Sequence, residues 1–429
     1  MGYFDGYHIF RDPIHGYIKV YDIERDIINS LAFQRLRRIK QLGPTNLVYH
    51  GADHTRFAHS LGVMELATRV FETIILKDKQ EHLIPWQSDE ERTNKKILLR
   101  LAALLHDVGH APLSHATESQ LFPKGLDHRS YSKKVIMEDT EIKEVLDKVE
   151  NDYGVTSDSI CNLIIREDSD EILQPILDGP LDADKMDYLW RDSFYTGVHY
   201  GKFDLERILN TLTVVVDKVI DAPSLGIEEG GVYTAEALML ARYYMFLQVY
   251  FHPVRRIYDL HYSSFIRGML NKYGGVYPET LTEYLRFDDS VVIAELEEEY
   301  YSKGENFKFA RIIFERKHHE LIHETNDFAS PAEEKLFFNR KKDIEQKFPD
   351  VELLADPTKD APNKFKKDPF YVKVRNPKTS SIADKYEIIN EKSNLIEKLN
   401  DEIHKFRLYC PRENVNEVKE FYKTLNFKP

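Results

Sequence analysis

Residues 98–118 read LLRLAALLHDVGHAPLSHATE, and this stretch determines how the rest of the chain is interpreted. Its first third is apolar apart from Arg100, which predicts a helix buried on nearly all sides in the centre of a domain. His106 and Asp107 follow where a glycine and a proline should end this helix. Adjacent ionisable groups are costly to bury unless they are satisfied, and a divalent cation would satisfy both.

His110 and His115 extend this group of potential metal ligands. Together with His106 and Asp107 they fall within ten residues, a density that packing alone does not explain. Any single histidine of this kind is more often a hydrogen-bonded core or surface residue. The cluster as a whole predicts a metal site.

Charge and length favour a small ligand. At 429 residues the chain can bury a large core, and its net charge of −13 argues against a protein that coats nucleic acid, which needs a basic surface. A small anionic ligand would require a local patch of positive charge on this acidic chain. Residues 33–43, FQRLRRIKQLG, supply one, with a solvated helix face as the alternative.

Cysteine usage and hydropathy indicate a cytoplasmic protein. Cys161 and Cys410 lack CxxC spacing, so neither a disulfide framework nor a cysteine zinc site is expected. The start, MGYFDGYHIF, lacks the pattern of a secretory signal. No stretch approaches the roughly 18 uncharged apolar residues of a membrane span.

Local patterns predict a mainly helical chain with some β structure. Breakers and alternating residues predict a hairpin over 9–21 and another over 211–231, and a loop is expected over 79–96. The C-terminal residues predict strands over 370–374 and 406–410 around a helix over 384–401. Helical spacing is found over 24–42, over 127–138, from 160, from 182, and over 234–272 with a kink at Pro253. Within 49–76 a further helix is expected after a cap at Asp53 or Thr55.

The helix expected from residue 182 carries several acidic side chains on one broad face. Asp184, Asp187 and Asp192 all fall there, together with Tyr188. Carboxylates gathered in this way repel one another unless a cation is present. An exposed helix with salt bridges is the alternative.

Three motifs resemble the HD-domain phosphohydrolases: HTRFAHSLG (54–62), LLHDVGHAPLSH (104–115) and LDADKMDYLWRD (181–192). The chain is most similar to the branch that contains the sterile-alpha-motif HD deoxynucleoside triphosphate triphosphohydrolases and their bacterial relatives. Matches at DPIHGY (12–17), FQRLRRIKQLG and FRLYCPRENV (406–415) extend the resemblance over almost the whole chain.

We therefore expect a mainly α-helical HD-domain core with a short N-terminal β-hairpin and a small C-terminal α+β lobe. The expected parts are the hairpin and basic helix (1–48), the HD catalytic core (49–275), a charged helical extension (276–355) and the α+β lobe (369–429).

Carried over position by position, the resemblance implies the residues of the site. The metal ligands would be His59, His106, Asp107 and Asp184, a set that suits iron, manganese, nickel or zinc, with magnesium as a companion of the nucleotide phosphates. The catalytic residues would be His110, His115 and His128. Glu118 stands where the animal member of this branch, the sterile-alpha-motif HD enzyme, has an aspartate. The substrate contacts would be Arg56 and Lys185 at the phosphates and Tyr188, Asp192 and Gln41 near the sugar.

The implied reaction is hydrolysis of deoxynucleoside triphosphates to deoxynucleoside and inorganic triphosphate. The residues alone indicate only a metal-dependent phosphohydrolase of an anionic small molecule. An HD-GYP phosphodiesterase and a guanosine tetraphosphate hydrolase are not favoured, because no GYP follows His106-Asp107 and no acidic pair stands at Val108-Gly109. Another nucleotidase or phosphodiesterase, or a nucleotide-binding regulatory module without turnover, remains as an alternative.

The resemblance also implies a nucleotide activator site between the subunits of a homo-oligomer, a dimer or tetramer. Deoxynucleoside triphosphates would then be both substrate and activator. Asn29 stands where the animal enzyme has an aspartate, which leaves a preference for guanine open. A plain oligomer interface or a solvated face is the alternative. The activator residues would be Asn29, Gln34, Arg35 and Arg37.

Overall fold

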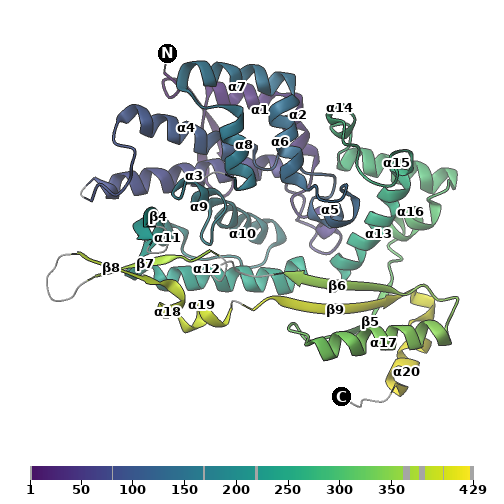
Figure 1. The fold of residues 1–429 in the computed structure, drawn as a ribbon. Helices are drawn as coiled ribbons and strands as arrows, with labels where there is room; N and C mark the ends of the chain where they lie inside the picture. Colours follow the sequence, from purple (N-terminus) through teal and green to yellow (C-terminus); the bar gives the residue numbers. More distant parts are fainter. Residues whose placement is uncertain are drawn as a thin grey trace.

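The computed structural model describes residues 2–79, 81–167, 170–217, 221–360, 368–375, 382–399 and 401–425. Within these residues the chain is mainly helical, as predicted, with two small sheets that contain the C-terminal strands (Figure 1) and a hairpin near the N-terminus. None of the helices in the described residues combines the length and the hydropathy that a membrane span requires.

The predicted central helix is confirmed as the second half of α4 (Asp89–Leu105), which packs along α3 (Arg56–Asp78). Every residue from 97 to 105 is buried. α4 begins earlier than predicted, inside the expected loop over 79–96, because Ser88 and Glu91 form a capping box. Arg100 is the one charged residue in the buried half, and its guanidinium donates to both carboxylate oxygens of Glu24 at 2.6 and 2.7 Å.

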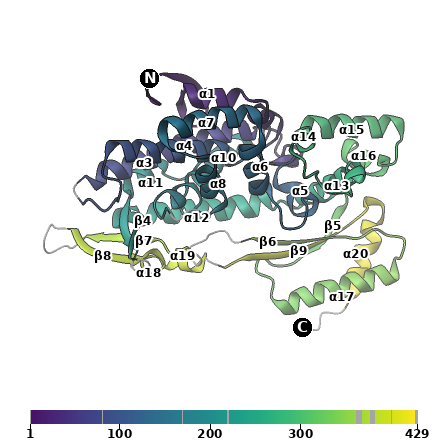
Figure 2. The same cartoon turned by 45° about the horizontal axis from the view of Figure 1, so that its top comes forward.

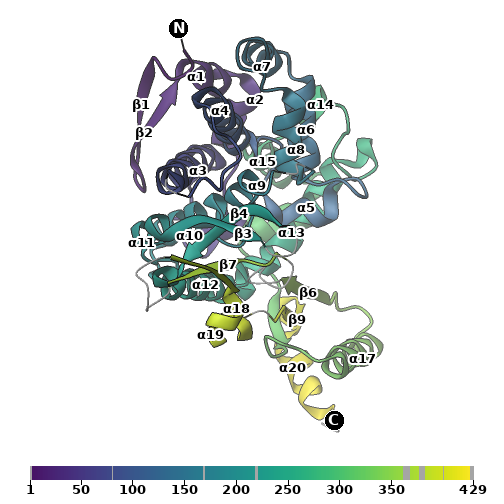
Figure 3. The same cartoon turned by 60° about the vertical axis from the view of Figure 1, so that its left-hand side comes forward.

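The N-terminal hairpin is confirmed as β1 (Tyr7–Asp12) and β2 (Gly16–Tyr21), which pair antiparallel beside α3 (Figure 3).

The prediction of a single helix over 24–42 is wrong. The segment forms α1 (Asp22–Asn29), α2 (Leu31–Gln34) and the 3-10 turn η1 (Arg35–Arg38). The chain breaks at Ser30 because its backbone is extended and its hydroxyl caps α2 by accepting a hydrogen bond from Phe33 N.

Two predicted helix starts are confirmed by their caps. The Asp127 carboxylate accepts from Ser130 N at 2.9 Å before α6, and the Asp182 carboxylate accepts from Lys185 N at 2.7 Å before α10. The remaining elements of this bundle are η2 (Gly43–Leu47), α5 (His115–Leu121), α6 (His128–Glu138), α7 (Thr140–Tyr153), α8 (Ser157–Ile165), α9 (Leu173–Leu177), α10 (Ala183–Thr196) and α11 (Leu205–Thr211).

The long helix expected over 234–272 is interrupted. It forms α12 (Val232–Met245), a π-helical turn η4 (Phe246–Tyr250) and α13 (Pro253–Met269), with Pro253 in the first turn of α13. Figure 2 shows the helical bundle on one side of α12 and the C-terminal strands on the other. The charged region beyond contains η5 (Asn271–Tyr273), α14 (Leu281–Tyr284), α15 (Asp289–Ser302), α16 (Phe307–Phe314) and α17 (Pro331–Lys347), together with an unpredicted strand β5 (Glu320–Glu324).

Two sheets contain the C-terminal strands. The predicted hairpin over 211–231 is confirmed as β3 (Leu212–Asp217) and β4 (Ala222–Glu228), followed by η3 (Glu229–Gly231). These strands continue into β7 (Tyr371–Arg375) and β8 (Ile382–Ile388) in the order β3-β4-β7-β8, and β7 runs parallel to β4. The second sheet has the order β5-β9-β6, with β6 (Leu354–Asp360) and β9 (Ile403–Cys410).

The segment 369–429 is therefore divided between two sheets whose other strands come from earlier in the chain. The helix expected over 384–401 is wrong in its first part, where β8 pairs with β7 along residues 382–388. Pairing with a strand outside the local window overrides the helical pattern here. Its second part forms α18 (Ile389–Lys392) and α19 (Asn394–Lys398), and the described chain ends with η6 (Arg412–Asn414) and α20 (Val415–Thr424).

Candidate metal centre and active site

Three helices bring potential metal ligands together. His59 on α3 faces Asp184 on α10, with Nε2 of the histidine 3.0 Å from Oδ1 of the aspartate. His106 stands at the C-terminal end of α4. The ligand atoms of these residues all lie within 4.8 Å of one another, a spacing that can hold one metal ion.

A hydrogen bond at Nδ1, the ring nitrogen that faces away from the site, holds each of the two histidines in place. His59 Nδ1 is 2.7 Å from Asp187 Oδ2, and His106 Nδ1 is 2.8 Å from the carbonyl oxygen of Ala103. Each Nε2 is thereby directed into the site. Within the described residues, Nε2 of His106 is buried and has no hydrogen-bond partner. A buried lone pair beside carboxylates fits a divalent transition-metal ion.

Asp107, the fourth predicted ligand, lies beside these three residues. Its Oδ1 lies 3.3 Å from His106 Nε2, and its Oδ2 lies 3.6 Å from His59 Nε2 and 2.5 Å from a guanidinium nitrogen of Arg56. Burial alone would raise the pKa of Asp107, but Arg56, His106 and His110 outweigh burial and hold the pKa well below its ordinary value. The carboxylate is therefore ionised, as metal ligation requires.

An outer network supports His59 through Asp187. Asp187 also binds His15 Nε2 at 2.6 Å and Arg191 Nε at 2.8 Å, and Arg191 donates in turn to Asp12 at 2.9 Å. The DPIHGY motif and the acidic face that carries Asp187 are both evident in the sequence, but local patterns predict no role for either. The motif reaches across the fold to hold a candidate metal ligand in place.

A second cluster lies against this centre. Glu118 on α5 binds His115 Nδ1 at 2.5 Å and His128 Nδ1 at 2.6 Å. The His128 ring stacks on His110 with 4.1 Å between centroids, and His110 Nε2 is 3.2 Å from Asp107 Oδ1. The four residues expected to be catalytic are thus gathered beside the four expected ligands.

The histidines of this second cluster differ in environment. Burial lowers the pKa of His110, and Arg56 lowers it further, so this imidazole is neutral. Burial would raise the pKa of Glu118, but His115 and His128 outweigh it and hold the carboxylate ionised. The side chain of His115 is 60% exposed, whereas that of His110 is 1% exposed. His115 is therefore the one best placed to meet a ligand from outside.

This second cluster also has the spacing of a metal site. In this cluster, however, both carboxylate oxygens of Glu118 are already bonded to imidazole nitrogens, one to His115 Nδ1 and the other to His128 Nδ1. A carboxylate that orients two imidazoles is the arrangement of an acid–base group. His59, His106, Asp107 and Asp184 therefore remain the candidate metal centre.

The residues expected at the phosphates occupy different positions. Arg56 is buried at the centre, where it donates to Asp107 and to Ser114 Oγ at 2.8 Å. Lys185 is also buried, and its ammonium donates to the carbonyl of Gly179 at 2.9 Å and to the Asp182 carboxylate. In this conformation Lys185 holds the turn before α10, so its contact with phosphate stays a prediction.

The residues expected near the sugar lie around the Asp192 carboxylate. His54 Nε2 is 2.8 Å from Asp192 Oδ1, and the Tyr250 hydroxyl donates to Oδ2 at 2.6 Å. Gln41 N donates to the carbonyl of His54 at 3.0 Å, and the ring of Tyr188 lies 6.2 Å from that of Tyr250. His54 and Tyr250 were missed, although His54 belongs to the quoted HTRFAHSLG motif.

The four residues expected at an activator site are divided. Arg35 is buried, and its guanidinium donates to the carbonyl of His110 at 2.8 Å. This placement corrects the expectation for Arg35, which supports the loop that carries His110 from inside. Asn29 and Arg37 are exposed, and Gln34 is half-buried and accepts from Arg37 Nε at 2.9 Å.

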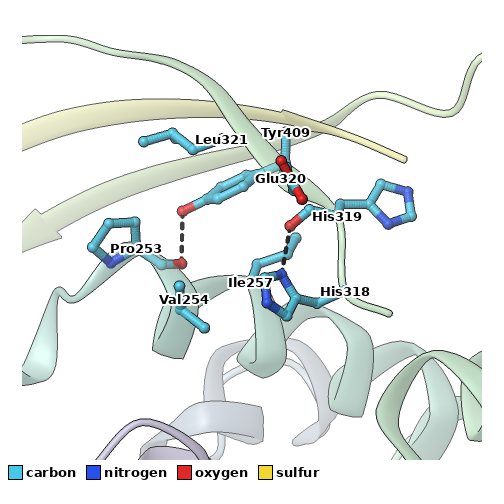
Figure 4. A pocket seen from close by; sticks show the side chains of 8 residues that line it. All are labelled: Pro253, Val254, Ile257, His318, His319, Glu320, Leu321 and Tyr409. Carbon is cyan, nitrogen blue, oxygen red and sulfur yellow. Dashed lines mark hydrogen bonds between the residues drawn. The ribbon is translucent and has the colours of Figure 1, made fainter. Parts of the chain in front are cut away.

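A separate cavity of about 300 Å³ lies between α13 and strands β5 and β9 (Figure 4). The Tyr409 hydroxyl closes one side of it by donating to the carbonyl of Pro253 at 3.0 Å. Glu320 is the single carboxylate among its lining residues. The cavity therefore lacks the grouped carboxylates of the metal centre.

Comparisons with known proteins match two regions of the chain to family profiles. The profile of the HD domain matches residues 56–192, and that of the HD-associated region matches residues 203–343. The chain is 36% identical over 301 residues to the uncharacterized protein YwfO of Bacillus subtilis, covering 66% of this chain and 64% of that protein. It is 34% identical over 258 residues to the deoxynucleoside triphosphate triphosphohydrolase SAMHD1 homolog of Dictyostelium discoideum, covering 57% and 46%.

The chain thus spans less than two thirds of the length of these curated relatives. Among solved structures, a hypothetical protein from Aquifex aeolicus superimposes with a TM-score of 0.76 at 30% identity, covering 97% of this chain and 99% of that one. A phosphohydrolase from Bacteroides thetaiotaomicron superimposes with a TM-score of 0.73 at 23% identity, covering 95% and 100%, which shows a shared fold.

Proposed function

We infer the activity of this chain from the family to which it belongs, the HD-domain phosphohydrolases with an HD-associated region. We propose that it hydrolyses deoxynucleoside triphosphates to deoxynucleosides and inorganic triphosphate. The observation that carries the proposal is the meeting of the two clusters, in which Asp107 lies 3.2 Å from His110 and 3.3 Å from His106. A relative named as a deoxynucleoside triphosphate triphosphohydrolase supports the choice of substrate.

We propose that His59, His106, Asp107 and Asp184 hold one divalent transition-metal ion. Two imidazoles and two carboxylates suit iron, manganese, nickel or zinc, and magnesium would accompany the nucleotide phosphates. When bound, such an ion supplies Lewis-acid activation of water and of a phosphoryl oxygen.

The residues of the chain supply charge and protons. Release of triphosphate requires water to attack the α-phosphorus while the bond to the 5′ oxygen breaks. His115, held by the Glu118 carboxylate, is placed to donate a proton to that leaving oxygen. Arg56, next to Asp107, supplies fixed positive charge for the phosphoryl oxygens.

The test is a screen of nucleotides on metal-loaded protein with the products separated by ion chromatography. We expect inorganic triphosphate and a deoxynucleoside in equal amounts, and no product from an Asp107→Ala control. Release of monophosphate or pyrophosphate would favour a nucleotidase or another phosphohydrolase. Tight nucleotide binding with no product would favour a regulatory module.

We further propose that the protein forms a homo-oligomer. In this assembly an activating nucleotide would bind in and before the basic segment 33–43, through Asn29, Gln34 and Arg37. The exposed guanidinium of Arg37, stacked 3.5 Å from the centroid of Phe57, supports this proposal. Hydrolysis of one deoxynucleotide should then rise when a second is added, and Arg37→Ala should abolish the rise while metal content stays the same. Simple hyperbolic kinetics in every pairwise mixture would contradict the activator site.

A further inference from the structure

The two residues before His115 have a left-handed backbone. Leu113 has φ of 60°, and Ser114 has φ of 54° with ψ of −136°. Both carry a Cβ, so this conformation costs free energy and persists only where the surroundings hold it. His115 is the first residue of α5, and its ring centroid lies 4.8 Å from that of His110. The turn at 113 and 114 therefore sets the direction in which the His115 side chain leaves the backbone.

Asp289 holds this turn through a backbone hydrogen bond. Leu113 N donates to Asp289 Oδ1 at 2.8 Å, and Lys40 N donates to Oδ2 at 2.9 Å. The aspartate is 3% exposed, and it lies in the first turn of α15, inside the region 203–343 that matches the HD-associated profile. A residue outside the HD domain thus fixes the backbone just before a proposed catalytic histidine.

Arg35 ties the same two segments together close to this contact. Its guanidinium donates to the carbonyl of Phe287 and to the carbonyl of His110, both at 2.8 Å. Phe287 stands two residues before Asp289, and His110 stands three residues before Leu113. The start of α15 is therefore fixed against the loop at two points, so the Asp289 carboxylate cannot easily follow the turn if the turn moves.

Lys40 links the carboxylate to the second residue of the turn. Its N–H donates to Asp289, and its carbonyl accepts from Ser114 Oγ at 2.7 Å. If the carboxylate is removed, the buried N–H of Leu113 loses its acceptor. A buried donor without an acceptor is costly, so the turn should shift to recover a partner.

We propose that Asp289 is a positioning residue for His115, whose carboxylate holds the Leu113–Ser114 turn in the left-handed conformation that directs the His115 imidazole to the leaving oxygen. This inference rests on the proposed function and gives the HD-associated region a part in the reaction. A displacement of a proton donor by about 1 Å is enough to slow a reaction severely.

The test changes the leaving group of the substrate. A deoxynucleoside triphosphate releases its 5′ oxygen as an alcohol, which takes up a proton as the bond to the α-phosphorus breaks. The analogue with sulfur in place of the 5′ oxygen releases a thiolate, which needs no general acid because a thiol has a pKa of roughly 8.5. The ratio of kcat/KM for the sulfur substrate to that for the oxygen substrate therefore reports proton donation and does not depend on the folded fraction of the preparation.

Asp289→Ala should lower kcat/KM for the oxygen substrate by roughly tenfold or more and for the sulfur substrate by less than about threefold, with bound metal unchanged. Asp289→Asn keeps the shape of the side chain and one acceptor oxygen for two N–H groups, so the ratio should rise less. His115→Ala is the reference for complete loss of proton donation. Glu295→Ala, which removes an exposed carboxylate from the same helix, is the matched control and should keep the ratio of the parent.

The same ratio in the parent and in both Asp289 variants would overturn the positioning role, even where kcat/KM falls for the two substrates together. An unchanged ratio in His115→Ala would refute the proton donation assigned to His115, and the role of Asp289 would fall with it. A parent that releases triphosphate from neither substrate would instead refute the proposed function.

Discussion

His59 has its two ring nitrogens bound to different carboxylates, Asp187 on one side and Asp184 on the other. Burial alone would lower the pKa of His59, but these two hydrogen bonds outweigh burial and raise it to about 10. The surrounding negative charge that favours a proton on this ring also favours a cation in its place. Metal binding at this centre should therefore release a proton.

The first residue-level prediction concerns the ligands. Asp107→Ala or Asp184→Ala removes one of four donors from a partly buried ion, so both metal content and turnover should be lost. Metal content is measured by elemental analysis of the dialysed protein. Asp350→Ala, at an exposed aspartate remote from both clusters in sequence, is the control and should keep both. Full metal with full turnover in either ligand variant would refute the assignment.

A second residue-level prediction separates proton transfer from metal binding. His115→Ala should keep the metal and lower kcat by roughly a hundredfold or more, the usual contribution of a general acid. His110→Ala should behave in the same way, because its ring packs on His128 without being an expected ligand. Elemental analysis and steady-state kinetics on the same sample give both quantities. Unchanged kcat in both variants would show that these histidines only neighbour the site.

At the scale of elements, the seam between α3 and α10 depends on Gly62. A Cβ there would lie 1.9 Å from Asp187 Oδ1 and 2.6 Å from a guanidinium nitrogen of Arg191. The two helices can approach closely enough for Asp187 to reach His59 only because α3 has no side chain at this position.

Gly62→Ala should therefore disturb the Asp187 network as well as the packing. We expect a loss of roughly 2–3 kcal/mol in the free energy of unfolding, as for overpacked core sites, and a tenfold or greater loss of metal affinity, as when an outer partner of a ligand is removed. Gly154→Ala, at a left-handed position with no atom within 4 Å, is the control. It should cost about 1–2 kcal/mol in backbone strain and leave metal affinity unchanged. Equal metal affinity in both variants would contradict this account of the seam.

At the scale of the whole molecule, a buried histidine pair joins the helical bundle to the β5-β9-β6 sheet. His261 on α13 accepts a hydrogen bond through Nε2 from His319 N, just before β5, at 3.3 Å. Burial, together with the nearby His319, His318 and Lys308, lowers the pKa of His261 to about 3. The unfolded chain binds a proton on this residue near pH 6.5.

Because the folded pKa is below the unfolded one, the unfolded state holds more protons between about pH 6.5 and 3, and stability falls as pH falls through this window. At pH 5 the loss from His261 is roughly 2 kcal/mol relative to pH 7. His261→Gln keeps an acceptor for His319 N but does not titrate. Between pH 7 and pH 5 the free energy of unfolding of this variant should therefore fall by roughly 2 kcal/mol less than that of the parent. Urea titrations at the two pH values measure the difference, and parallel losses in both proteins would refute it.

Local patterns were sufficient to predict the central helix, both hairpins, the helix starts at Asp127 and Asp182, and the grouping of His106, Asp107, His110 and His115. These features depend on neighbours within a few positions: apolar spacing, a capping side chain or a turn. The resemblance to a family then linked His59 and Asp184 to the cluster at His106. No local pattern placed these two helices side by side.

Only the tertiary structure decided which distant groups complete each site. His15 reaches Asp187 across 172 positions, and Tyr250 reaches Asp192 across 58. The basic segment 33–43 predicts an exposed Arg35, yet this side chain is buried and donates to the carbonyl of His110. The strand β8 follows a helical pattern in sequence but pairs with β7, and β7 itself joins β4. Apart from β7, which directly precedes β8 in the chain, the partner that satisfies a buried polar group or a strand edge lies far away in the sequence. Side-chain spacing and propensity carry no information about such a distant partner.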